Sequence, residues 1–268
     1  RACNARCVGC ISAQDKDSPV KVTPQCRLAF TPTAAEIVEV MRVHQERESA
    51  QPIYSFGQGC EGDPLTNAAL LAESIGLFRA QGGRGTVNCN TNASNPRAVE
   101  DLAEAGLTSL RVSLNSARPA LYERYYRPTN YSFDDVRASI ATARKHGLFV
   151  SLNLLFFPGI TDTEDELEAL ARLVGENGVS MIQWRNLNID PEWYYGLLCG
   201  QEEQADTSPS LGLALFMKRL KKLCPWLRYG YFNPYLGERA ELAAPLPGQW
   251  QMPAAAMPHD PEDLKTVS

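Results

Sequence analysis

The 268-residue sequence lacks several features that would assign it to whole classes of protein. No apolar run reaches the roughly 18 residues that a membrane-spanning helix needs, and no signal-peptide pattern is present. No basic stripe is visible, and 31 acidic against 26 basic side chains give a formal net charge of −5. The sequence therefore predicts neither a membrane partner nor a nucleic-acid partner.

Histidine is also scarce, with three residues far apart in the sequence, but cysteine is not. Cys3, Cys7 and Cys10 stand within eight residues, and the others are scattered. The chain is too long and too rich in core residues to need a disulfide framework, so we predict a reducing, cytoplasmic setting. The scattered cysteines are expected to be free and mostly buried thiols; they are Cys26, Cys60, Cys89, Cys199 and Cys224.

From residue 31 onward, strand and helix patterns alternate with short connections. Strands are expected over 52–57, 85–92, 107–116, 148–157 and 179–189, and helices over 31–44, 65–80, 95–106, 132–147, 161–178 and 208–223. Such alternation predicts a parallel sheet with right-handed crossovers. With a further strand expected before Cys3, the predicted fold is α/β, a partial (β/α)6 TIM-like barrel. Its core should span residues 1–191, followed by an irregular extension of one helix and Pro/Ala-rich coil over 192–268.

Several predicted strands carry a row of polar residues on one face, because side chains two apart share a face. The rows are Asn88, Asn90 and Asn92; Arg111, Ser113 and Asn115; Ser151 and Asn153; and Asn186, Asn188 and Asp190 with Trp184. A closed barrel fills its interior with Val, Ile and Leu. The polar rows therefore indicate a lumen that holds a polar ligand at the carboxyl ends of the strands, unless they are strand ends exposed to water.

The CxxxCxxC spacing of Cys3, Cys7 and Cys10 has four interpretations. A structural zinc site usually needs two separated ligand pairs, and no second pair exists. A ferredoxin cluster needs a fourth cysteine, for which Cys26 has no recognisable spacing. Three thiols could also be close by chance. The fourth interpretation is an iron–sulfur cluster with one iron left open to bind a ligand, and it explains why there are three cysteines rather than four.

With this spacing ahead of alternating strands and helices, the chain resembles the radical S-adenosylmethionine (radical SAM) enzymes. The resemblance implies that Cys3, Cys7 and Cys10 hold a four-iron, four-sulfur (4Fe–4S) cluster. In that family the open iron chelates the amino and carboxylate groups of S-adenosylmethionine (SAM). An electron entering the sulfonium then yields methionine and a 5′-deoxyadenosyl radical, which abstracts hydrogen from the substrate.

Four further segments resemble the family in the same order along the chain. SFGQGCEGDPL (55–65) resembles the glycine-rich turn that contacts the SAM amino group, NCNTNAS (88–94) the third strand, RVSLNS (111–116) the fourth and VSLNLLFFPGITDTEDE (150–166) the fifth. The resemblance covers residues 3–190. The SAM contacts that it implies are Glu61, Gly62, Asp63, Asn90, Asn92, Ser113, Asn115 and Asn153.

The sequence departs from the family in the cysteine motif and in the turn. Gly9 stands where an aromatic residue often precedes the third cysteine, and Glu61 and Asp63 leave open which residue faces the SAM amine. The stretch MIQWRNLNIDPEWYY (181–195) should lie at the barrel mouth. Its candidate substrate contacts are Trp184, Arg185, Asn186, Asn188 and Asp190, where Arg185 would suit a carboxylate or a phosphate.

Two functions remain open from the sequence. The first is a radical SAM enzyme acting on a small-molecule or peptide substrate, with a reducing partner such as ferredoxin or flavodoxin. The second is a non-catalytic iron–sulfur protein for electron transfer or assembly. The polar rows and the 55–65 turn favour the first, since an electron carrier needs no SAM pocket.

Overall fold

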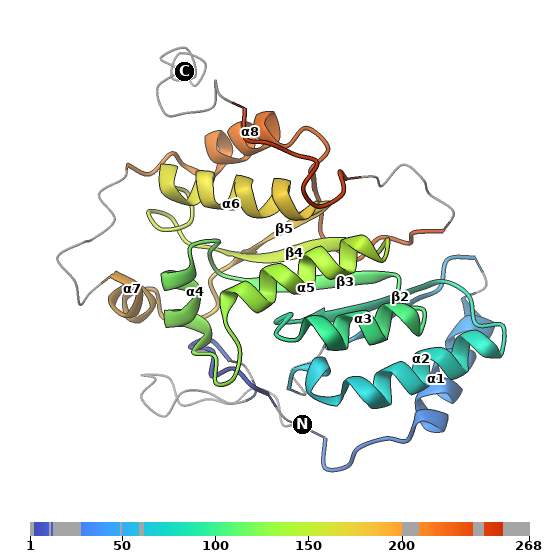
Figure 1. Ribbon diagram of the computed structural model, residues 1–268. Coiled ribbons are helices and arrows are strands. Elements are labelled where there is room, and N and C mark those ends of the chain that lie inside the picture. The colour runs from blue at the N-terminus through green and yellow to red at the C-terminus, as the bar shows by residue number, and fades with distance from the viewer. Residues whose placement is uncertain are drawn as a thin grey trace.

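The computed structural model describes residues 3–10, 12, 28–48, 50–58, 62–199, 209–237 and 244–253. Within these residues one sheet has its strands paired in chain order and all parallel (Figure 1). The strands are β1 (Ile53–Phe56), β2 (Thr86–Thr91), β3 (Ser109–Leu114), β4 (Phe149–Phe156), β5 (Met181–Asn186) and β6 (Arg228–Tyr229). This is the α/β fold with parallel strands that the alternation of elements predicts.

The helices follow the strands in the expected order. They are α1 (Ala34–Arg47), a short 3-10 turn η1 (Pro64–Asn67), α2 (Ala68–Ala80), α3 (Pro96–Glu104), α4 (Pro119–Tyr126), α5 (Phe133–Lys145), α6 (Glu164–Asn177), α7 (Pro191–Cys199) and α8 (Leu213–Leu223). Capping boxes begin α1 at Thr33 and α5 at Ser132. These reciprocal side-chain bonds satisfy backbone N–H groups that the first helical turn leaves unpaired.

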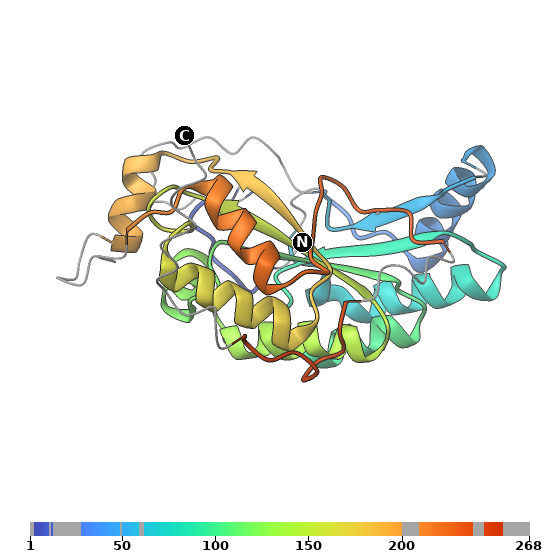
Figure 2. The ribbon, with the colours of Figure 1, turned by 90° about the horizontal axis from the view of Figure 1, so that it is seen from above.

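The core lies between the helices and the convex face of the sheet. Figures 1 and 2 show α2, α3, α5 and α6 side by side on this face. The strand residues that face them are apolar and buried, among them Val87, Cys89, Leu110, Val112 and Leu152. Burying this apolar face provides the main driving force for the fold, and it leaves the alternate, polar residues on the concave face.

The concave face is crossed by a segment of residues 230–237, which follows β6 and is called the strap here. Figure 2 shows it passing over the sheet from β6 toward β1. Arg111 donates to Asn233 Oδ1 (3.1 Å) and to the Tyr231 carbonyl (3.1 Å), and the Leu236 amide donates to Thr86 Oγ1 (2.8 Å). The partial barrel is therefore walled by the strap on the side where no strand closes it.

The extension after residue 191 is more structured than the sequence indicates. It contains the predicted helix, α8, but also α7 and β6, and β6 pairs with β5. No helix is predicted from the sequence between residues 116 and 132, where the structure has α4, which ends at Tyr126. The strand expected before Cys3 lies outside the described residues. None of the helices in the described part of the chain combines the length and apolar character that a bilayer crossing requires.

Candidate functional site

The cysteine segment lies at the carboxyl ends of the strands, against the end of α4. The Arg6 amide donates to the Tyr126 carbonyl (2.9 Å) and the Val8 amide to the Tyr125 carbonyl (3.0 Å). Val8 itself is buried in the core. The segment is therefore held at both its backbone and its one large apolar side chain.

Asn4 ties the same segment to the residues that follow β2. Its side chain donates to Ser94 Oγ (2.9 Å) and accepts from Asn92 Nδ2 (2.9 Å). The Asn4 carbonyl accepts from the amide of Thr129 (3.0 Å). Asn92, predicted as a SAM contact, thus has one side-chain atom engaged in positioning the cysteine segment.

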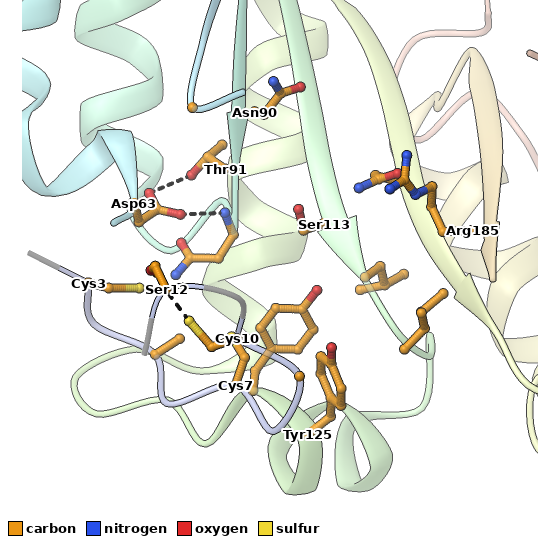
Figure 3. A pocket seen from close by; sticks show the side chains of 18 of the residues that line it. Cys3, Cys7, Cys10, Ser12, Asp63, Asn90, Thr91, Ser113, Tyr125 and Arg185 are labelled. Carbon is orange, nitrogen blue, oxygen red and sulfur yellow. Dashed lines mark hydrogen bonds between the residues drawn. The ribbon is translucent and has the colours of Figure 1, made fainter. Parts of the chain in front are cut away.

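A pocket of about 260 Å³ opens beside this segment. The three cysteines line it together with residues from the ends of the strands and from the turn after β1 (Figure 3). Of the residues predicted from the sequence, it is lined by Cys3, Cys7, Cys10, Gly62, Asp63, Asn90, Asn92, Ser113, Asn153, Arg185, Asn186 and Asn188. Residues from segments far apart in the sequence therefore meet in one cavity.

The chemistry of the three thiols fits an iron–sulfur cluster. Burial raises the pKa of Cys7, and the neighbouring Cys3 and Cys10 raise it further because thiolates repel one another. A bound metal reverses this preference, since a coordinating thiol is deprotonated. Among the described residues, no three His, Cys, Asp or Glu side chains gather closely enough for a single metal ion. Three thiols spread around one cavity suit a cluster of several irons better than a mononuclear site.

The Asp63 carboxylate is occupied by the protein. Its Oδ1 accepts from the Leu65 amide (3.0 Å) and from Thr91 Oγ1 (2.7 Å), and its Oδ2 accepts from the Asn92 amide (2.7 Å). Figure 3 shows the last two of these bonds. Burial raises the pKa of Asp63, and the three hydrogen bonds oppose the rise. Asp63 therefore fastens the turn after β1 to the end of β2, which positions the backbone of Gly62 at the pocket.

Gly9 is explained by Tyr125. A Cβ atom at position 9 would lie 2.8 Å from Tyr125 Oη and 3.0 Å from Ile189 Cγ2. The Tyr125 side chain lines the pocket next to Cys7, as Figure 3 shows. Tyr125 thus fills space that an aromatic residue before the third cysteine would need. Tyr125 could not be predicted as a pocket residue from the sequence, because no helix is predicted over the residues of α4.

The face assignment of β5 was wrong. Asn153 pairs in register with Gln183, and Leu155 with Arg185, so Gln183 and Arg185 face the concave side. Trp184 points to the other side and contacts the rings of Phe216 and Tyr229. It does not line the pocket.

Three other predicted residues either do not line the pocket or lie outside the residues that the structure describes. Asn115 is fully buried and donates to the Leu121 carbonyl (3.0 Å). Asp190 is exposed and accepts from the Trp193 amide (2.7 Å) at the start of α7. Glu61 lies outside the described residues. Of the described residues, neither Asn115 nor Asp190 lines the pocket.

Below the pocket, the concave face carries buried polar atoms without a partner among the described residues. They are Asn88 Oδ1, Ser109 Oγ, Ser151 Oγ, Asn153 Oδ1 and Gln183 Oε1. Unpaired polar atoms are costly to bury. Five on one face indicate that the lumen receives a polar ligand or ordered water, as the polar rows predict.

A curved parallel sheet with a three-thiol pocket at the carboxyl ends of its strands defines a TIM-barrel-like protein with a cluster-binding site. The family model described as the radical SAM superfamily matches residues 1–174. The chain belongs to the radical SAM superfamily. Proteins of this superfamily use a 4Fe–4S cluster and SAM, and the donor set described above fits both.

Solved structures support the fold at low sequence identity. A radical SAM methyltransferase from Sphaerobacter thermophilus has a TM-score of 0.55 and 17% identity, over 87% of this chain and 64% of its own. Methylornithine synthase (PylB) has a TM-score of 0.53 and 15% identity, over 85% and 61%. Streptococcus suis SuiB bound to SAM has a TM-score of 0.52 and 14% identity, over 87% and 48%.

The chain therefore spans less than two thirds of each of these three proteins. No curated protein matches the sequence significantly.

Proposed function

We propose that this chain is the core of a radical SAM enzyme that acts on a small-molecule or peptide substrate. When bound, the 4Fe–4S cluster and SAM would supply reductive cleavage to a 5′-deoxyadenosyl radical, which abstracts hydrogen from the substrate. The observation that carries the proposal is the position of three cysteines in one pocket beside a concave sheet face that carries unpaired polar atoms. An electron carrier would need the thiols but not the lumen.

The residues of the chain have distinct parts in this proposal. Cys3, Cys7 and Cys10 would ligate the cluster. The turn at Gly62, fixed by Asp63, would offer backbone carbonyls to the SAM ammonium, since the Asp63 carboxylate already accepts three hydrogen bonds. Carbonyl oxygens suit an ammonium donor.

Polar side chains that line the pocket on β2, β3 and β4, or directly after β2, would orient the ribose and the carboxylate of SAM; they are Asn90, Asn92, Ser113 and Asn153. Tyr125 lies beside Cys7 and would exclude water from one side of the cluster. A reducing partner such as ferredoxin or flavodoxin would supply the electron. Because the thiols must stay reduced, we place the protein in the cytoplasm.

The test is cleavage of SAM by protein reconstituted with iron and sulfide without oxygen and reduced with dithionite. We expect 5′-deoxyadenosine in the wild type and its loss in a Cys7→Ala variant. Cys224→Ala is the matched control, because Cys224 is buried near α6, far along the chain from the pocket, and should leave the product unchanged. A well-formed cluster with neither SAM binding nor cleavage would favour the alternative, a non-catalytic electron-transfer or assembly protein.

A further inference from the structure

Two arginines project from the concave face of the sheet without an acidic partner among the described residues. Arg111 lies on β3 and Arg185 on β5. The Arg111 residue is 5% exposed, yet its guanidinium forms no ion pair with any described carboxylate. A buried cation is unfavourable unless an anion or several hydrogen bonds compensate it.

The hydrogen bonds of Arg111 compensate it only in part. Its two terminal nitrogens donate to neutral acceptors on the strap, Asn233 Oδ1 and the Tyr231 carbonyl. Its Nε is buried and has no partner in the described part of the chain. Burial lowers the pKa of Arg111 to about 10, and the nearby charge of Arg185 contributes. Both cations lie on the concave face of the sheet, with β4 between their two strands.

The atoms around the pair are polar and unpaired. Ser151 lies opposite Arg111 in register, and Gln183 is on the same face between Ser151 and Arg185. Ser151 Oγ and Gln183 Oε1 are buried without partners among the described residues. The Ser151 hydroxyl can donate to an anion, and Gln183 can donate through its Nε2, whereas its Oε1 only accepts. Together, these residues provide the positive charge and the hydrogen-bonding groups that would surround a bound anion.

Arg185 reaches the same cavity as the cysteines from the opposite side. Figure 3 shows Cys3, Cys7 and Cys10 on one side of the pocket and the Arg185 guanidinium across it. In the proposed function, SAM would be held at the side of the pocket that carries the cysteines. Arg185 is then left for a second molecule.

We propose that Arg111 and Arg185 bind a carboxylate or phosphate group of the substrate inside the barrel, between β3, β5 and the strap. This inference deepens the proposed function and rests on it. Guanidinium groups bind both kinds of anion through paired hydrogen bonds. The anionic group would fix the substrate in the lumen and leave the remainder of the molecule facing the SAM end of the pocket.

In the experiment, inorganic phosphate or acetate is added in separate titrations to the reconstituted protein in the presence of SAM. NaCl at the same ionic strength is the control. The thermal midpoint and the apparent dissociation constant are measured. We expect at least one anion to raise the midpoint beyond the NaCl control. Phosphate alone would indicate a phosphorylated substrate and acetate alone a carboxylic acid. No specific effect of either anion would overturn the proposal.

Substitutions of the two arginines test where the anion binds. Arg185→Gln and Arg111→Gln should each weaken the effective anion at least tenfold, and Arg111→Lys, which keeps the charge, should weaken it less. Arg84→Gln is the control, because Arg84 is an exposed arginine outside the pocket. Unchanged anion binding in the Arg111→Gln/Arg185→Gln double variant would overturn the proposal. Arg185 is exposed, so its variant tests the site even if Arg111→Gln fails to fold.

A SAM-binding assay on the same variants separates the two proposals. Loss of SAM binding in Arg185→Gln with the anion response intact would assign Arg185 to SAM and overturn the substrate site. Loss of the anion response with SAM binding intact would support it. An anion site in a protein that binds no SAM would support the site and contradict the proposed function.

Discussion

Gly9 and the side chain of Tyr125 together set the shape of the cluster site. The position has little room because Tyr125 Oη and Ile189 Cγ2 would each lie within about 3 Å of an added Cβ. Real Cβ contacts are rarely this short, so either neighbour must move. The cysteine segment and Tyr125 therefore depend on each other for their positions.

We expect a Gly9→Ala variant to hold less cluster than the wild type, because the new methyl group displaces the backbone between Cys7 and Cys10. The measurement is iron content and the visible absorbance of the cluster after reconstitution. Adding Tyr125→Phe, which removes the hydroxyl nearest the new methyl, should restore part of the loss. The control is Gly76→Ala, where no atom lies within 4 Å of the new Cβ. Equal iron content in Gly9→Ala and Gly76→Ala would contradict this account.

At the scale of single residues, the sequence predicts which residues line the pocket better than it predicts what each side chain contacts. Cys3, Cys7, Cys10, Ser113 and Asn153 do line the pocket as expected. On β5 the two-residue period holds, because Gln183 and Arg185 share the concave face, but the polar row was assigned to the face of Trp184. The strand ends at Asn186, and the two-residue period has no meaning in the loop beyond it.

At the scale of elements, the buried carboxylate of Glu166 joins α6 to the chain after β3. It accepts from the Ala117 amide (2.7 Å), from Arg118 Nε (3.1 Å) and from Ser116 Oγ. Burial raises its pKa from 4.5 to about 7, against the lowering effect of these donors. The connection between α6 and the chain after β3 is therefore sensitive to pH.

The direction of this dependence follows from the raised pKa. The folded state keeps the Glu166 proton to a higher pH than the unfolded state does, so stability falls as pH rises from 4.5 to 7 and is level above. The shift corresponds to about 3 kcal/mol. We expect a Glu166→Gln variant to lack this fall in urea unfolding measured between pH 4.5 and 8. Glu168→Gln, on the exposed face of the same helix, should retain it. Identical pH profiles for wild type and Glu166→Gln would refute the assignment.

The strap offers a second prediction at this scale. Asn233 accepts from Arg111 and donates to Ser55 Oγ (3.3 Å), so it links β3 and β1 across the concave face. An Asn233→Ala variant should lose about 1–3 kcal/mol of stability, since Arg111 is left with fewer acceptors. Hydrogen exchange of the amides in 230–237 should become faster. Phe232→Ala is the control because that ring is 74% exposed. Equal exchange rates in the two variants would mean that Asn233 does not hold the strap.

The elements that the sequence missed share a physical reason. β6 has two residues, too few to show any periodicity. α4 and α7 have eight and nine residues and are rich in aromatic side chains, which are weak helix formers. The two helices pack against each other, for example through Tyr125 and Tyr194, and a tertiary contact of this kind leaves no local pattern in the sequence. The longer elements, with capping boxes or a clear apolar period, could be predicted to within a few residues.

At the scale of the whole molecule, the division at residue 191 stays a prediction from the sequence. The segment beyond residue 191 packs against the sheet and contributes to its hydrophobic core. α8 places Phe216 and Leu220 in the common core, and Trp184 of β5 packs between Phe216 and Tyr229. β6 covers the edge of β5 that would otherwise offer unpaired backbone groups. The barrel core and the extension therefore share one hydrophobic core.

We expect a chain ending at Cys199 to lose cooperative folding, because it exposes the Trp184 side of β5 and leaves that edge unpaired. The measurements are the thermal transition and the binding of a dye to exposed apolar surface. Phe216→Ala is a milder test in the full chain and should lower stability by about 3–5 kcal/mol, as expected for a large side chain removed from a core. A truncated chain with a sharp transition at the wild-type midpoint would show that the core folds alone. The strap and α8 would then be an attached unit rather than the wall that completes the barrel.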